Sequence, residues 1–336
     1  MNNTTADGQD KPRVPLTKRA VGAAAWALFR KTGALLPLFI ILVVYFSLAS
    51  DNFMTTQNMS TISTQAVYFT IIVIAQAIVI ITGGLDLSVG AGVALTSIIT
   101  AMVVTAFPTT GGIMLAAGAG ILTGATVGAA NGLLVATFRV SPLIVTLGMA
   151  SVVSGLGLII TGGVPIFNLP GDFKVALYTS HVLGIPIAWT VAIVVIALAY
   201  VLLYWHRIGR NWYAVGGNPI SAHIAGVPVG RALFLAYLSA GILVGIAGVL
   251  LTARVGSGEP NLGGTFALQS IAAAVLGGIS LRGGQGLLWG AILGGVFLVM
   301  LRNGLDLIGV GSYVQMLISG GLLIFAVVVD HYWNRR

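Results

Sequence analysis

The sequence predicts an all-α polytopic membrane protein with about ten transmembrane helices and both termini in the cytoplasm. Of its 336 residues, 57% are hydrophobic and only 7% are charged. So few charges could not cover the surface of a soluble domain. Two further observations define the architecture: apolar segments of membrane-spanning length recur along the chain, and basic residues collect in alternate connections.

Ten apolar segments are long enough, or nearly so, to cross a bilayer core of about 30 Å. The eighth and ninth are short for a full span. In chain order the segments are 33–49, 63–82, 88–107, 112–136, 142–161, 187–205, 232–252, 267–281, 285–301 and 312–330.

The basic residues predict the orientation of these spans. With the N-terminus in the cytoplasm, all but three of the 16 lysines and arginines fall on the cytoplasmic side, as the positive-inside rule requires. The exceptions are Lys174, Arg254 and Arg302. Adding or removing one span would scatter the arginines over both sides, so an even number of spans is favoured.

The spans divide the chain into three parts. Residues 1–32 are expected to be a cytoplasmic N-terminal tail, 33–330 the transmembrane domain, and 331–336 a cytoplasmic C-terminus. The basic start, the apolar run after it and the small residues at 47–49 resemble a cleavable signal peptide. We interpret the first span instead as a retained anchor helix.

An internal repeat is predicted at an offset of about 172 residues. GGLDLSVGAGVALTSI at 83–98 aligns with GSGEPNLGGTFALQSI at 256–271, and two shorter echoes occur at nearly the same offset. The offset pairs spans two to five with spans seven to ten, and an odd shift of five spans makes this an inverted repeat. The alternatives are convergent Gly, Ala and Leu composition, or a parallel relation of 83–90 to GGISLRGG at 277–284.

Asp86 lies between the second and third spans, where Gly83 and Gly84 break the apolar run. Asp86 or Ser88 could cap the following helix by accepting backbone N–H bonds. Alternatively, the break could expose polar groups to a hydroxylated solute, or Asp86 could relay protons. The repeat aligns Asp86 with Glu259, which the charge rule places on the outer side of the membrane.

Polar residues within the spans are few and mostly neutral, as the hydroxyl groups of a sugar or polyol would require, although helix packing uses the same side chains. They and the residues of the two breaks form the predicted translocation path: Gln65, Tyr68, Gln76, Asp86, Ser88, Thr96, Glu259, Asn261, Phe266 and Gln269. Glycines spaced four apart at 120–132 and 286–294 predict close helix packing, within the chain or between two copies.

The longest cytoplasmic connection, 206–231, contains a short and well-delimited helix. Asn218 and Pro219 form a start signal, and Gly226 forms a stop. An ordinary interfacial loop would show the same signals. The alternative is a docking helix for a cytoplasmic partner, with the candidate coupling residues Arg207, Arg210, Asn218, Pro219, His223, Gly226 and Arg231.

Nothing in the sequence predicts an enzyme. The chain has no cysteine, its four histidines show no metal-ligand spacing, and it contains no glycine-rich phosphate loop ending in lysine. We therefore expect no cofactor or metal in this chain, and no hydrolysis of ATP by a phosphate loop of its own.

Three segments resemble the permease subunits of bacterial ABC importers of the ribose, xylose and arabinose type. They are GGLDLSVG at 83–90, GRNWYAVGGNPISAHIAGV at 209–227 and LGGISLRGGQGLLWGAILGG at 276–295. The resemblance implies a multi-pass permease of the bacterial inner membrane. Its partners would be a second permease copy, a cytoplasmic sugar-import ATPase, and a periplasmic or lipid-tethered binding protein, with no nucleic acid.

By the same resemblance, the loop helix at 219–225 would be the coupling helix that enters a groove on the ATPase. Members of this family often carry acidic residues before the Ile-Ala-Ala run of span eight, where this chain has FALQSI at 266–271. A pentose, a hexose, a polyol or a sugar-like signalling molecule therefore remain open as substrates. The alternative function is a proton-coupled secondary transporter using Asp86 and Glu259.

Overall fold

The computed structural model describes residues 35–333, which are almost entirely helical. The predicted tail at 1–32 and residues 334–336 lie outside this range. The helices are α2 (Leu35–Ala49), α3 (Thr56–Ile81), α4 (Val89–Ala106), α5 (Thr110–Phe138), α6 (Pro142–Thr161), α7 (Gly171–Lys174), η1 (Val175–Thr179), α8 (Ile187–Tyr200), η2 (Val201–Trp205), α9 (Arg207–Gly217), α10 (Pro219–Ile224), α11 (Val229–Val255), α12 (Phe266–Leu276), α13 (Leu288–Leu307) and α14 (Ser312–Trp333). Two short strands, β1 (His181–Val182) and β2 (Ile185–Pro186), form a hairpin.

The predicted all-α polytopic fold is confirmed. Within the described residues, seven helical segments are long and apolar enough to cross a membrane: α3, α4, α5, α6, α8 with η2, α11 and α13. Shorter apolar helices occur at α2, at α12 and in the first part of α14. These ten segments correspond in order to the ten predicted spans, and α14 continues to Trp333, past the predicted boundary at 330.

The eighth span differs from its prediction. The apolar run at 267–281 is already short for a full span, and α12 is shorter still: it has only 11 residues, about 16 Å of helix, and is too short to cross a bilayer. The helix ends because Gly278 adopts a φ of +86° and its N–H bonds the Val275 carbonyl, while the Ile279 N–H bonds the Ala274 carbonyl. The next helix consequently begins at Leu288 and not at 285.

Two sets of four helices, α3 to α6 and α11 to α14, pack in matching pairs. Helix α5 packs along α11, and its counterpart α13 packs along α3. Helix α4 contacts α5 and α6, as α12 contacts α13 and α14. Matching contacts between the two sets are what the predicted inverted repeat of spans two to five and seven to ten requires.

The two repeats touch at residues that the sequence alignment pairs. A Cβ on Gly90, near the start of α4, would overlap the carbonyl oxygen of Gly263, which immediately precedes α12. A Cβ on Gly263 would lie 3.2 Å from the carbonyl oxygen of Gly90. Residues that contact their own repeat partner lie at the axis relating the two halves, so the first turn of α4 and the residues before α12 meet there.

The glycine strip of α5 packs within the chain. A Cβ on Gly124 would come within 2.7 Å of the Gly245 Cα atom, and a Cβ on Gly241 would come within 2.7 Å of the Gly128 Cα atom. The backbones of α5 and α11 therefore approach directly, as small residues four apart allow.

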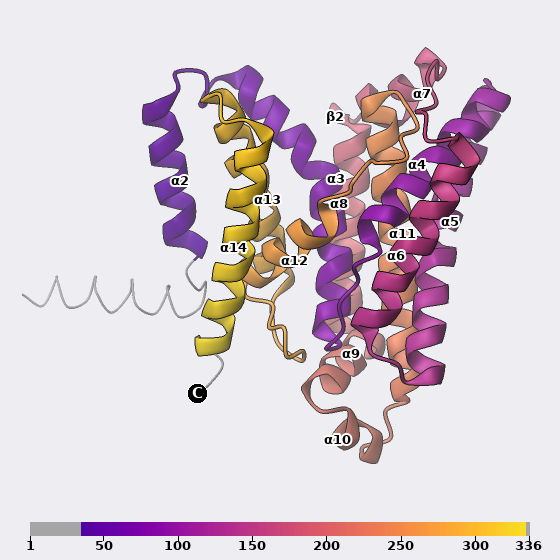
Figure 1. Cartoon of the computed structure of the whole chain (residues 1–336), viewed down its shortest axis with the longest axis vertical. Coiled ribbons are helices and arrows are strands. Elements are labelled where there is room, and N and C mark those ends of the chain that lie inside the picture. Colours follow the sequence, from indigo (N-terminus) through magenta and orange to yellow (C-terminus); the bar gives the residue numbers. More distant parts are fainter. Residues whose placement is uncertain (1–34, 334–336) are drawn as a thin grey trace, which may run out of the picture.

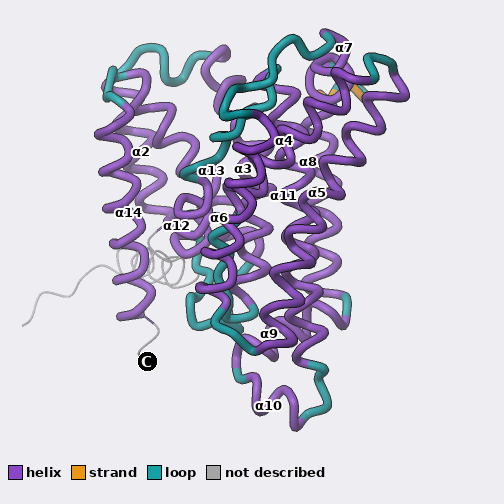
Figure 2. The backbone as a smooth tube through the Cα atoms, turned by 45° about the vertical axis from the view of Figure 1, so that its right-hand side comes forward, coloured by secondary structure: helices purple, strands orange, loops and turns teal. Residues whose placement is uncertain are grey.

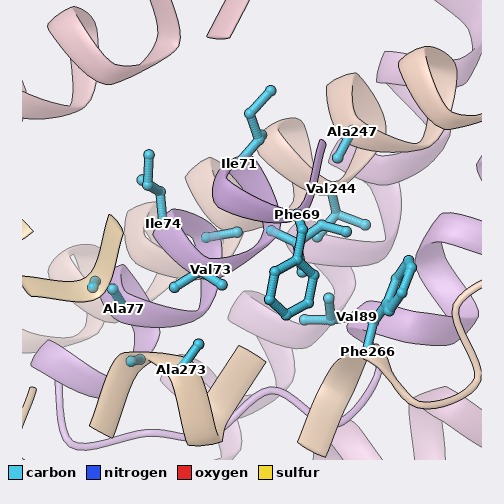
Figure 3. Packing of buried hydrophobic residues seen from close by; sticks show 14 of the residues in the cluster. Phe69, Ile71, Val73, Ile74, Ala77, Val89, Val244, Ala247, Phe266 and Ala273 are labelled. Atoms are coloured by element: carbon cyan, nitrogen blue, oxygen red, sulfur yellow. The ribbon is translucent and has the colours of Figure 1, made fainter. Parts of the chain in front are cut away.

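Helix α3 lies at the centre of the molecule, between a group formed by α2, α12, α13 and α14 and a group formed by α4, α5, α6, α8 and α11 (Figure 1). Its apolar side chains from Phe69 to Ile81 are buried, and Figure 3 shows Phe69 beside Val244 of α11 and Phe266 of α12. An all-apolar helix surrounded by protein is typical of the interior of a membrane bundle.

The two ends of the bundle differ in their extramembrane elements. Helices α9 and α10 project at one end, and α7 lies at the other (Figure 2). The α10 end contains Arg207, Arg210 and Arg231, and it is therefore the cytoplasmic end. The α7 end, where Arg254 and Lys174 lie, is the outer end.

Candidate translocation path

The cytoplasmic half contains the first helix break, residues 82–88, which we call the inner break. Asp86 is almost completely buried there, with 3% of its surface exposed. Its Oδ1 atom accepts hydrogen bonds from the Ser88 N–H at 2.8 Å and from the Ser88 hydroxyl at 2.6 Å. Asn131 of α5 donates to the same hydroxyl at 2.8 Å.

Side chains from three further helices satisfy the backbone of the inner break. The Gln76 side-chain amide of α3 pairs with both backbone groups of Asp86. Its nitrogen donates to the Asp86 carbonyl oxygen at 3.0 Å, and its oxygen accepts from the Asp86 N–H at 3.2 Å. The Thr146 hydroxyl of α6 accepts from the Leu87 N–H at 3.1 Å. The Tyr237 hydroxyl of α11 is 3.5 Å from the Leu85 carbonyl oxygen.

These contacts correct the capping interpretation of Asp86 and Ser88. Ser88 is the residue before α4, but its side chain makes no capping bond to the helix and bonds Asp86 instead. Asp86 stabilises the turn that leads into α4 rather than the first turn of the helix. The carboxylate and its neighbours therefore form a closed polar cluster inside the protein.

The second helix break, residues 256–265, lies in the outer half, and we call it the outer break. Glu259 is partly exposed, and its carboxylate accepts one hydrogen bond from the Ser257 hydroxyl at 2.8 Å. Gly258 exchanges two backbone hydrogen bonds with Ile166, at 2.8 and 2.9 Å. The outer break is thus joined to the long outer connection between α6 and α8.

Aromatic and polar side chains form a continuous outer cluster beside this break. Arg254 donates to the Tyr68 hydroxyl at 3.2 Å, and its guanidinium carbon lies 5.4 Å from the centre of the Tyr68 ring. The Tyr68 ring is 6.1 Å from the ring of Phe266. One turn further along α12, Gln269 accepts from Arg302 at 3.1 Å.

The predicted path residues therefore separate into two groups with different surroundings. Gln76, Asp86 and Ser88 belong to the inner cluster, while the others except Thr96 lie on the outer half: Gln65, Tyr68, Glu259, Asn261, Phe266 and Gln269. Thr96 faces α5, where its hydroxyl is 3.4 Å from the Gly120 carbonyl oxygen.

The predicted path omitted residues that bond to it. Arg254 and Arg302 in the outer cluster, and Asn131 and Thr146 in the inner one, were not among the predicted path residues. Their signal is a polar side chain within or at the end of an apolar span. Within residues 35–333, no group of three His, Cys, Asp or Glu side chains could hold a metal ion.

The cytoplasmic connection folds as two short helices in series. The side-chain oxygen of Asn218 accepts a hydrogen bond from the Ser221 N–H at 2.9 Å and so caps α10. Pro219 occupies the first helical position. Gly226, with a φ of +82°, ends this turn. The start and stop signals are confirmed, and only Asn218 separates α9 from α10.

Helix α10 exposes an apolar pair outside the membrane-spanning segments. Ile220 and Ile224, four residues apart, are 73% and 82% exposed, and His223 beside them is also exposed. Arg207, Arg210 and Arg231, the predicted basic neighbours, are exposed at the same end. Helix α10 thus presents an apolar pair with basic side chains around it at the cytoplasmic end.

Comparison with known proteins identifies the family. Residues 58–327 match the model described as the permease component of a branched-chain amino acid transport system. The chain is 35% identical over 315 residues to the ribose import permease RbsC of Escherichia coli K12, covering 91% of this chain and 95% of that protein.

Two further relatives have other sugars in their names. The chain is 35% identical over 309 residues to the D-allose transport system permease AlsC of Escherichia coli K12, covering 91% and 93% of the two chains. It is 32% identical over 326 residues to the galactose/methyl galactoside import permease MglC of Escherichia coli K12, covering 93% and 97%. No solved structure matches. The chain belongs to this family of importer permease components, which includes the ribose, allose and galactose permeases.

Proposed function

We propose that the chain is the transmembrane subunit of an ATP-driven, binding-protein-dependent importer of a monosaccharide or sugar-like polyol. The observation that carries this proposal is the similarity to three sugar permeases over about nine-tenths of the chain. The description of the family model names branched-chain amino acids as the transported substrate. The full-length relatives favour a sugar instead.

The composition of the outer cluster supports a hydroxylated solute. Tyr68 and Phe266 offer aromatic faces, and Gln269 and Gln65 offer amides in the same half of the molecule. Aromatic rings and neutral hydrogen-bonding groups suit a sugar, because each hydroxyl needs a donor or acceptor in place of water. Weak binding here suits a permease whose binding protein supplies the selectivity.

The mechanism we propose is alternating access. A loaded binding protein docks on the outer surface, including the connection 162–186. Closure of the partner ATPases on ATP then moves α10, and the permease halves of a dimer rock around the path. ATP and its magnesium ion would be held by the partner ATPase, and this chain would hold no cofactor.

Helix α10 is the proposed contact with the ATPase. Its exposed isoleucines would enter an apolar groove, and the nearby arginines favour acidic residues around that groove. A helix-in-groove contact with a few apolar anchors is strong enough to hold a partner and short enough to move as a unit.

The proton-coupled alternative has less support. Proton relay needs titratable groups that exchange with water on both sides. Asp86 is enclosed by Ser88, Gln76 and Asn131, and the neighbours named above offer no second carboxylate.

Reconstitution separates the two functions. The chain is placed in liposomes alone, or together with its cognate ATPase and binding protein. We expect uptake of a radiolabelled sugar only in the complete system, and only when ATP is present on the side of the membrane where the ATPase is bound. Uptake by the isolated chain under a proton gradient would contradict the proposal.

The α10 contact has its own test. Ile220→Asp with Ile224→Asp, and separately His223→Glu, should release the ATPase from the purified permease, because a charge is placed in an apolar groove. The control is Leu183→Asp, which places the same charge on a fully exposed leucine at the outer end. Equal recovery of the ATPase with all variants would refute the docking role.

A further inference from the structure

Three glycine-containing segments meet at the cytoplasmic end, directly before α10. They are the end of α3 with Gly83, the end of α9 with Gly216, and the connection between α12 and α13 with Gly283 and Gly284. A Cβ on Gly216 would overlap the Ile81 carbonyl oxygen and lie 2.5 Å from the Gly284 nitrogen. We call this contact the glycine junction.

Backbone hydrogen bonds and one side chain hold the glycine junction together. The Gly284 N–H donates to the Ile81 carbonyl oxygen at 2.8 Å, which joins the α12–α13 connection to α3. The Tyr213 hydroxyl of α9 donates to the Gly286 carbonyl oxygen at 3.0 Å, which joins α9 to the same connection. A Cβ on Gly283 would lie 2.8 Å from the Gly83 Cα atom, so the backbones are in direct contact.

Direct backbone contact makes the glycine junction stiff. Side chains at an interface can change rotamer and absorb a displacement, whereas backbones in van der Waals contact transmit it. Helix α9 is also fixed to the bundle, because the Trp212 indole N–H donates to the Ala232 carbonyl oxygen at 2.8 Å. Only Asn218 separates α9 from α10, so the two helices move together.

The segments joined at the glycine junction lead to both helix breaks. Helix α3 ends at Ile81, and the inner break follows it immediately. The α12–α13 connection follows α12, whose other end is the outer break. A displacement of α9 therefore reaches both breaks through two short backbone routes.

We propose that the glycine junction carries the displacement of α10 to both helix breaks at once, so that Gly216, Gly284 and Tyr213 are positioning residues for transport. This proposal depends on the proposed function, because α10 must move when the ATPase binds ATP. The junction would act as a two-state element rather than as part of the solute path.

The test uses the complete importer in proteoliposomes, with sugar uptake and ATP hydrolysis measured in the same vesicles. Gly216→Ala adds a methyl group against the Ile81 carbonyl. The matched control is Gly217→Ala, one residue along the same helix, where a Cβ has open space. Tyr213→Phe removes the bond to Gly286 without adding volume.

We expect all three variants to retain the ATPase. Sugar transported per ATP should fall by about two- to tenfold in Tyr213→Phe, the range that one neutral hydrogen bond contributes, fall further in Gly216→Ala, and stay unchanged in Gly217→Ala. If Gly216→Ala does not assemble with the ATPase, the sugar transported per ATP by Tyr213→Phe is the deciding measurement. Unchanged transport per ATP in Tyr213→Phe would overturn the proposal.

A second readout is insensitive to a general loss of stability. Because the chain has no cysteine, a single spin label at Thr265→Cys, exposed at the outer break, reports local motion. We expect ATP to change its spectrum in the parent complex and to change it less with Tyr213→Phe. If the parent complex shows no ATP-driven uptake, the proposed function fails; if it transports and Tyr213→Phe behaves identically, only this inference fails.

Discussion

The inner and outer breaks occupy equivalent places in the two repeats but are built differently. Around the inner break, side chains from α3, α6 and α11 bond the backbone, Asn131 of α5 donates to the Ser88 hydroxyl, and the Asp86 carboxylate is buried. The outer break has a partly exposed Glu259 held by Ser257, and Asn261 is exposed. An alignment that pairs the two acids therefore pairs residues with different surroundings.

The difference indicates a division of tasks between the repeats. A buried break whose backbone is bonded by side chains of α3, α6 and α11 is costly to open, because each of these bonds would have to be replaced by water. The outer break is also hydrogen-bonded, to Ile166 and to the Ser97 hydroxyl of α4, but Glu259 and Asn261 remain accessible to solvent. The inner break is thus suited to holding the fold, and the outer break to meeting solute.

The largest expected effect is on the inner break. Gln76→Leu leaves the buried N–H and C=O groups of Asp86 without partners, and should cost about 2–6 kcal/mol of stability. Gln65→Leu is the matched control, since Gln65 lies on the same helix, half-buried, in the outer half. Thermal unfolding in detergent should show a large loss for Gln76→Leu and a small one for Gln65→Leu. Equal losses of thermal stability in the two variants would contradict the different roles of the two breaks.

The role of the Asp86 charge gives the second prediction. Asp86→Ala removes the acceptor of both Ser88 bonds and should cost about 2–4 kcal/mol. Asp86→Asn keeps an oxygen at that position, so it should retain the fold and sugar uptake with the parent pH profile. Loss of uptake in Asp86→Asn with a changed pH dependence would instead support proton coupling.

In the outer cluster, a substitution should lower sugar uptake more than it lowers stability. Tyr68→Phe removes the acceptor of the Arg254 bond, which should cost about 1 kcal/mol or less, because the guanidinium can still stack on the ring. We expect sugar uptake to fall several-fold all the same. Tyr178→Phe, which loses a bond to the Thr64 carbonyl on the same half, serves as control. An equal fall in sugar uptake in Tyr68→Phe and Tyr178→Phe would indicate a packing effect.

The smallest effect is expected where a buried hydroxyl makes no bond. Thr100 on α4 is buried, and its hydroxyl has no partner within the described residues. Thr100→Val should change stability by less than about 0.5 kcal/mol or increase it, because no bond is lost. Thr146→Val, which loses the bond from Leu87 at the inner break, should be clearly destabilised in the same melting assay. A destabilised Thr100→Val would mean that the hydroxyl has a partner in solution.

Much of the fold follows from local signals. The ten apolar segments, the breaks at 83–88 and 256–264, and the start and stop of the helix at 219–224 could all be predicted, because length, glycine and capping residues act over a few positions. The eighth span ends earlier than its predicted boundary at 281, because Gly277 and Gly278 end α12 inside a run that is still apolar enough to continue. Apolarity alone does not distinguish a span from half a helix followed by a buried connection.

The candidate site could be predicted only in part. Gln76, Asp86 and Ser88 were identified as polar residues in an apolar setting, but assigning them to the solute path was an interpretation that their contacts do not favour. The fourth member of their cluster, Asn131, is 43 residues from Ser88 along the chain. Nothing local to either residue specifies that contact.

The sequence by itself determined the class of the protein, the order and orientation of its spans, and the existence of two breaks related by an inverted repeat. These depend on apolar length and on the placement of charge, which are properties of each segment. The folded bundle alone shows that Asp86 is buried at the inner break while Glu259 is partly exposed at the outer one, and that glycines of three segments meet at the cytoplasmic end. Those features depend on which distant backbones and side chains approach one another, and packing of the whole bundle sets that.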